Sequence, residues 1–137
     1  MTDDQWSVEF KSAFALRNTD PNGTVTRLRL LSRRAAKSER SAVGAWHAAQ
    51  SLEMAATILS GAGRHREAAA LFRQVAKQHR GLLRQHGYGM SSALASAALE
   101  LFKAGQQKQA VPLAWEALRM FGQFPDPAAS MKRSFAA

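Results

Sequence analysis

The chain of 137 residues is 46% hydrophobic and 21% charged, a balance typical of a globular domain and not of a disordered segment. It contains no cysteine, which excludes disulfides, thiolate metal sites and thiol nucleophiles. Lysine and arginine number 19 against 10 aspartates and glutamates, and the net charge of +9 favours an anionic partner: nucleic acid, an acidic peptide or anionic lipid.

The first ten residues, MTDDQWSVEF, lack the apolar segment of a secretory signal peptide. No run reaches the roughly 18 apolar residues that a membrane-spanning helix requires. We therefore expect a cytoplasmic protein without a membrane span.

Turn-like stretches divide a chain that is rich in helix-forming residues and has almost no strand-like alternation. The clearest stretch is NTDPNG at 18–23, and HGYGMSS at 86–92 is another. Helices joined by short connections predict an all-α fold of about three antiparallel helix hairpins. The expected helices are 4–17, 25–40, 42–60, 64–86, 91–103 and 107–121, with a short C-terminal helix from Pro127.

A glycine turn followed by a helix rich in small residues occurs twice, 42 residues apart. GRHREAAALF begins at Gly63, and GQQKQAVPLA begins at Gly105. Several positions before and after the two turns match at this single offset, which indicates an internal repeat. The matching pairs are Leu52 with Leu94, Ala55 with Ala97, Ala56 with Ala98, Leu59 with Leu101, Gly63 with Gly105, Ala68 with Ala110, and Leu71 with Leu113.

This pattern resembles the tetratricopeptide repeat (TPR), in which large and small residues alternate on two helices around a glycine turn. The TPR period is about 34 residues, so each copy here is longer by about two helical turns. The resemblance implies that these additional residues lengthen the second helix of each copy, as in kinesin light chains and bacterial regulatory TPR proteins. The TPR-like positions are Leu52, Ala55, Ala56, Leu59, Gly63, Ala68, Phe72 and Val75, then Leu94, Ala97, Ala98, Leu101, Gly105, Ala110, Ala114 and Ala117.

The resemblance implies a single TPR-like domain built as a short right-handed solenoid. Small residues such as Ala56 and Ala68 would then lie where paired helices approach closely. The terminal faces of so short an array would be completed by self-association through the terminal helices or by a host complex. The implied units are a degenerate hairpin at 1–40, repeats at 42–86 and 91–122, and a tail or capping segment at 123–137.

In TPR proteins the first helices line a concave surface that binds a protein segment, and the resemblance implies a partner-binding groove of the same kind here. Its first half is polar and its second half is largely apolar, which suits an acidic or mixed polar and apolar segment. The expected groove residues are Gln50, Glu53, Thr57 and Ser60 in the first copy, and Ala95, Leu99, Phe102 and Lys103 in the second.

Two helices are also expected to carry a basic stripe opposite their apolar face. Such stripes fit either a nucleic-acid backbone or a solvated face that keeps the protein soluble. We expect the second stripe to run along one helix for about 27 Å. The stripe residues are Arg29, Arg33, Lys37 and Arg40 in the first helix, and Arg66, Arg73, Lys77, Arg80 and Arg84 in the second.

The sequence offers no pattern of catalytic chemistry. His79 and His86 would lie about 10 Å apart along a helix, too far to share a metal ion. The acidic residues are scattered, and no phosphate-binding loop is present. We therefore expect no enzyme activity, no metal and no cofactor. The three tryptophans, Trp6, Trp46 and Trp115, are expected in the core or between repeats.

Two functions follow as hypotheses. The first is a non-enzymatic protein-interaction module or adaptor that docks a protein segment in the groove. The alternative is a small basic helical subunit that binds nucleic-acid backbone within a larger assembly. A weaker third is a partner-dependent regulator of transcription, because long TPR-like repeats recur in such proteins.

Overall fold

The computed structural model describes the backbone of residues 1–38, 42–80 and 83–123; the side chains of residues 38, 42 and 83–87 lie outside the description. Within these ranges the fold is all-α, with six helices and no strand, as predicted. The expected C-terminal helix from Pro127 lies outside the described residues. The helices are α1 (Asp3–Ala15), α2 (Pro21–Ser38), α3 (Ala42–Gly61), α4 (His65–Arg80), α5 (Leu83–Lys103) and α6 (Gln107–Gln123).

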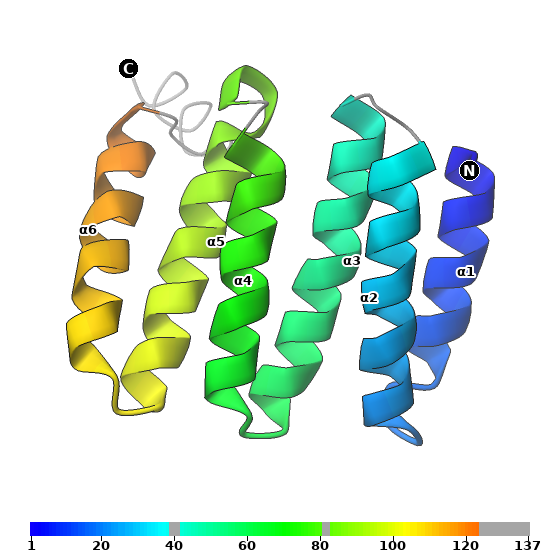
Figure 1. The fold of residues 1–137 in the computed structure, drawn as a ribbon, viewed down its shortest axis with the longest axis horizontal. Helices are drawn as coiled ribbons and strands as arrows, with labels where there is room; N and C mark the ends of the chain where they lie inside the picture. The colour runs from blue at the N-terminus through cyan, green and yellow to red at the C-terminus, as the bar shows by residue number, and fades with distance from the viewer. Residues whose placement is uncertain (39–41, 81–82, 124–137) are drawn as a thin grey trace, which may run out of the picture.

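The six helices stand side by side in chain order, from α1 at one end of the row to α6 at the other (Figure 1). Each helix packs mainly on its neighbours in the sequence, and the contact of α1 with α2 is the least extensive of these. α3 also touches α5, although α4 separates them in the chain. This arrangement leaves an outward strip on α3 and another on α5 next to each other.

The second helix starts earlier than predicted. α2 begins at Pro21 and not at Val25, because Asp20 caps it: Asp20 Oδ1 accepts a hydrogen bond of 3.0 Å from the backbone N–H of Gly23. Proline fits the first helical position, where its missing N–H has no partner to lose. The predicted loop at 18–23 is therefore half helix.

The predicted helix over 64–86 is wrong, and so is the break at 86–92. α4 ends at Arg80, α5 begins at Leu83, and the glycine-containing stretch lies inside α5. Gly89 accommodates a neighbouring helix: a Cβ built there would lie 2.8 Å from His79 Nε2 on α4. The extra repeat length also lies in the first helices of each copy, α3 and α5 with 20 and 21 residues, and not in α4 and α6 with 16 and 17.

The two glycine turns have the same backbone geometry, 42 residues apart. Gly63 has φ +77° and Gly105 has φ +75°, the left-handed region that favours glycine. The Arg64 N–H donates to the Leu59 carbonyl at 2.9 Å, and the Gln106 N–H donates to the Leu101 carbonyl at 2.8 Å. Both α3 and α5 therefore end in the same Schellman motif, so the repeat extends from side chains to backbone hydrogen bonds.

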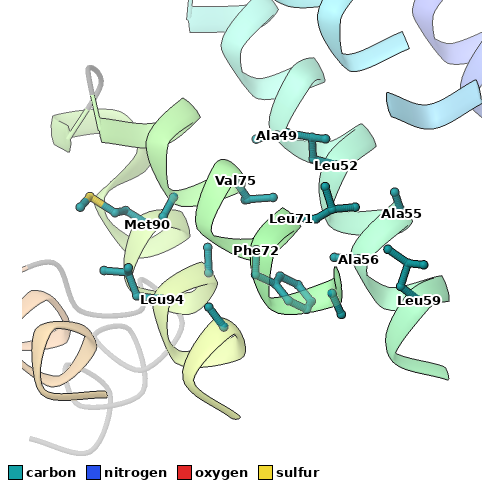
Figure 2. Close-up of a cluster of buried hydrophobic side chains, with 14 of the residues drawn as sticks. Ala49, Leu52, Ala55, Ala56, Leu59, Leu71, Phe72, Val75, Met90 and Leu94 are labelled. Atoms are coloured by element: carbon teal, nitrogen blue, oxygen red, sulfur yellow. The ribbon is translucent and has the colours of Figure 1, made fainter. Parts of the chain in front are cut away.

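The core contains an unusual share of alanine. Figure 2 shows Leu52, Ala56 and Leu59 of α3 opposite Leu71 of α4, with Met90 and Leu94 of α5 beyond. Alanine has little side chain to separate two helices, so its burial between them permits close approach. Most of the repeat alanines are buried, as predicted, with Ala55, Ala56, Ala68, Ala97 and Ala110 at 0% exposed, Ala117 at 2% and Ala98 at 3%, whereas Ala114 is half-buried.

The turn geometry predicts opposite effects for alanine at Gly61, the last residue of α3, and at Gly63 in the turn that follows. A Cβ at Gly61 or at Gly63 would meet no atom within 4 Å, so only backbone conformation distinguishes them. We expect Gly63→Ala to lower the free energy of unfolding by about 1–2 kcal/mol, whereas Gly61→Ala raises it by up to about 1 kcal/mol. Urea unfolding followed by circular dichroism measures both. Equal effects of the two variants would contradict the assigned turn.

Candidate partner-binding surface

Two outward strips on α3 and α5 form the candidate surface. On α3, Trp46, Gln50, Glu53 and Thr57 follow helical spacing and lie within about 60° of one another around the helix axis. On α5 the strip is longer, about 22 Å from its first to its last residue. It consists of Tyr88, Ser92, Ser96, Leu99 and Lys103.

A pocket of about 330 Å³ opens between the two strips. α3 and α5 form its sides, and Phe72 and His79 of α4 also line it. The volume is at the lower end of the range for ligand pockets. Its lining residues are Trp46, Ala49, Gln50, Glu53, Phe72, His79, Tyr88, Gly89, Ser92, Ala93 and Ser96.

The four groove residues predicted on α3 divide into two groups. Gln50 and Glu53 line the pocket, and Thr57 continues the exposed strip beyond it. Ser60 is half-buried, and its hydroxyl donates to Glu100 Oε1 at 2.5 Å. Ser60 therefore links α3 to α5 through this hydrogen bond.

The four residues predicted on α5 also separate. Leu99, 54% exposed, and the exposed Lys103 belong to the strip that borders the pocket. Phe102, 43% exposed, and the half-buried Ala95 lie about 60–80° around the helix from Ser92. These two residues therefore stand at the edge of the surface.

Sequence reasoning missed Trp46, Tyr88, Ser92 and Ser96, which complete the pocket. A signal for the last three was present, because their spacing of four residues is that of one helix face. It was overlooked because Tyr88 fell in the stretch predicted to be a break, and Ser92 fell at the start of the helix predicted after it. Their role depends on α5 continuing through the glycines to Leu83.

The pKa values of two glutamates in this region are shifted in opposite directions. Burial raises the pKa of Glu53, which lines the pocket. Burial also acts to raise the pKa of Glu100, but hydrogen bonds from Ser60 and His65 and the charge of Lys103 outweigh it and lower that pKa. Glu53 is thus poorly compensated by the protein, and Glu100 is well compensated.

Glu100, only 4% exposed, joins three elements. It accepts from Ser60 of α3 at 2.5 Å, from His65 Nδ1 at the start of α4 at 2.6 Å, and lies 3.8 Å from Lys103 Nζ. Serine, histidine and glutamate here do not form a catalytic relay, because the carboxylate separates the serine from the histidine instead of orienting the histidine toward it. The cluster is a structural contact between helices.

The basic stripes lie on α2 and α4, away from the pocket. Arg29, Arg33 and Lys37 line a groove of about 190 Å³ with Gln74 and Gln78 of α4. No acidic residue is among the residues that line this groove. Side chains of this composition present positive potential to solvent.

The predicted stripe on α4 is shorter than expected. Arg66, Arg73, Lys77 and Arg80 are exposed on this helix and span about 21 Å. Arg84 belongs to α5, and its side chain lies outside the description. The prediction of a single 27 Å stripe along one helix is therefore wrong. Arg40, assigned to the α2 stripe, lies outside the described residues.

The tryptophans differ from one another. Trp6 is packed as expected: it stacks on His47 with ring centroids 4.2 Å apart and donates to Ser51 Oγ at 3.0 Å. Trp46 is 44% exposed in the pocket, and Trp115 is 68% exposed on α6. Burial of Trp115 was predicted wrongly, because its helix is the last one described and no described helix covers that face.

No protein-family model, curated protein or solved structure matches this chain. Within the described ranges, no three histidine, aspartate or glutamate side chains gather where they could hold a metal ion. None of the helices that the structure describes is long and apolar enough to cross a membrane.

The Glu100 cluster predicts a pH-dependent contribution to stability. A carboxyl whose pKa is lower in the folded state stabilises the fold above its unfolded pKa, and this stabilisation is lost as pH falls through the folded pKa. We expect Glu100→Gln to cost about 1–3 kcal/mol at pH 7 and clearly less at pH 3. Urea unfolding at both pH values measures this, with Glu116→Gln on α6 as a control outside the cluster. A cost for Glu100→Gln that is independent of pH would contradict the assignment.

Proposed function

We propose that this chain is a non-enzymatic protein-interaction module, an adaptor that binds a segment of a partner protein across the α3 and α5 strips. The observation that carries the proposal is the pocket between these strips, continuous with the exposed Thr57 and Leu99. The helices that form the strips end in identical turns, so the surface is built from two copies of one unit.

We further propose that the helix pairs α1–α2, α3–α4 and α5–α6 are TPR-like hairpins of a short right-handed solenoid. Three observations support this: the 42-residue repeat, the buried alanines and the contact between α3 and α5 across α4. In this arrangement the first helices of successive hairpins share one face, where a TPR protein binds its partner. The proposal includes a cytoplasmic location.

The surface has chemical polarity along its length. Glu53 lies at the pocket end, the apolar Leu99 follows on α5, and Lys103 closes the strip. A matching segment would carry a cationic group, then an apolar residue, then an acidic group. Mixed character of this kind suits an extended or helical peptide that is read at spaced positions.

Substitution of the apolar part of the strip tests this function. We expect Leu99→Asp to abolish capture of a partner protein from lysate, because it places a charge in the apolar part of the strip, and Phe102→Asp at its edge to weaken capture. Val111→Asp on α6 is the matched control, since Val111 is as exposed as Phe102, at 43%. Quantitative affinity purification with mass spectrometry measures the loss, and circular dichroism confirms that helicity is kept.

Retention of every captured protein by Leu99→Asp would contradict the groove. Equal loss with Val111→Asp would place the interaction on α6 instead, where Val111, Trp115 and Leu118 form an exposed apolar strip. Self-association through terminal helices would produce that second result, and sedimentation of the purified chain would then identify it.

A second candidate function is binding of nucleic-acid backbone. The observation that favours it is the groove between α2 and α4, lined by Arg29, Arg33 and Lys37 and by no acidic residue. Three cations along one helix match a run of phosphates, and the exposed stripe on α4 adds to the same potential.

A salt series distinguishes this candidate. If all three groove cations contact phosphates, replacing them by alanine reduces the slope of log K against log salt concentration by about 2.7. Fluorescence anisotropy with labelled RNA and DNA measures the slope. The control replaces three exposed cations elsewhere, Lys11, Lys108 and Arg119, and removes the same charge. Identical slopes for the two triple variants would show that the change in slope depends on net charge alone, and would contradict a phosphate-binding groove.

A further inference from the structure

The pocket between α3 and α5 contains one acid and no lysine or arginine, in a chain with a net charge of +9. Glu53 is that acid. Within the part of the chain that the structure describes, no hydrogen bond or ion pair engages its carboxylate, unlike those of Glu9, Glu67 and Glu100. An uncompensated carboxylate at the mouth of a pocket favours a cationic ligand.

Two aromatic rings line the same pocket as this carboxylate. Trp46 is 44% exposed and precedes Glu53 by two helical turns on α3, and Tyr88 is 40% exposed on α5. Indole and phenol faces attract ammonium and guanidinium groups, indole most strongly. His79, 3% exposed on α4, meets the Trp46 ring edge-on with centroids 6.1 Å apart and so helps to fix it.

Gly89 allows this arrangement. A Cβ at this position would lie within 3 Å of two atoms of the His79 ring, so any larger residue would displace the histidine that touches Trp46. The Tyr88 ring also rests against Phe121 of α6, with centroids 5.9 Å apart. Both aromatic walls therefore have support from a neighbouring helix, which is the preorganisation that a specific site needs.

We propose that this pocket, formed by Trp46, Glu53 and Tyr88, binds one cationic side chain of the partner segment, with arginine preferred. The carboxylate can accept two hydrogen bonds from a guanidinium, and the guanidinium plane can stack on the indole. The raised pKa of Glu53 agrees, because an incoming cation supplies the compensation that the protein withholds. This inference rests on the proposed function and names the residue that anchors the segment.

Short synthetic peptides test the pocket without knowledge of the partner. The probes are Ac-Ala-Ala-Arg-Ala-Ala-amide and its lysine and citrulline analogues, since citrulline keeps the shape of arginine without the charge. Titration of the ¹⁵N-labelled full chain follows the indole N–H signal of Trp46, assigned with a Trp46→Phe variant. We expect saturable shifts, with the arginine peptide binding at least about 10-fold more tightly than the citrulline peptide.

Glu53→Gln should abolish the preference for arginine over citrulline, whereas Glu116→Gln should leave it intact. A second variant, Trp46→Leu, should weaken the arginine peptide with Glu53 present, and is followed through the Gly89 amide. Equal binding of the arginine and citrulline peptides, a preference that survives Glu53→Gln, or no saturation by the arginine peptide overturns the proposal. If partner capture still depends on Leu99 in that case, the groove stands and only the cation site falls.

Discussion

The close approach of neighbouring helices at small side chains is the constraint on which the rest of the structure depends. Ala55, Ala56 and Ala68 in one repeat, and Ala97 and Ala110 in the next, are fully buried. Larger residues at these points would push the helices apart, since cores are packed to the density of organic crystals and do not stretch to absorb volume. The spacing that the alanines permit allows α3 and α5 to touch across α4, and the candidate surface exists because they do.

Charge is distributed over this framework by side. Exposed cations lie on α2 and α4, and three of those on α2, Arg29, Arg33 and Lys37, line the groove between these two helices. The pocket between α3 and α5 instead contains a single acid, Glu53. Long-range attraction of an anionic partner and the proposed recognition of a cationic side chain would therefore use different surfaces, and the two would be compatible within one mixed segment. The buried Glu100 contributes to neither, because Ser60 and His65 satisfy it internally.

The sequence predicted the parts of the fold that depend on local pattern. Helix content, the turns at Gly63 and Gly105 and the burial of most repeat alanines follow from periodicity and turn chemistry, and the structure has these features, with Ala114 half-buried. The predicted limits of α4 and α5 were wrong because glycine at position 89 is typical of a turn. Only the close approach of the His79 ring explains why a glycine stands inside this helix. Tyr88 was missed with them. The pairing of Ser60 with Glu100 joins residues 40 positions apart, so no local pattern reveals it.

The volume tolerated at Ala56 is the most direct measure of close helix packing. Ala56→Leu adds the same atoms as Ala70→Leu on the exposed side of α4, so their comparison separates burial from helix propensity. Close packing predicts a loss of about 1–3 kcal/mol in the free energy of unfolding for Ala56→Leu, and a change within about 0.5 kcal/mol for Ala70→Leu. Urea unfolding of both variants measures these changes. An unchanged free energy of unfolding for Ala56→Leu would show that α3 has room beside its neighbours, and would contradict the account.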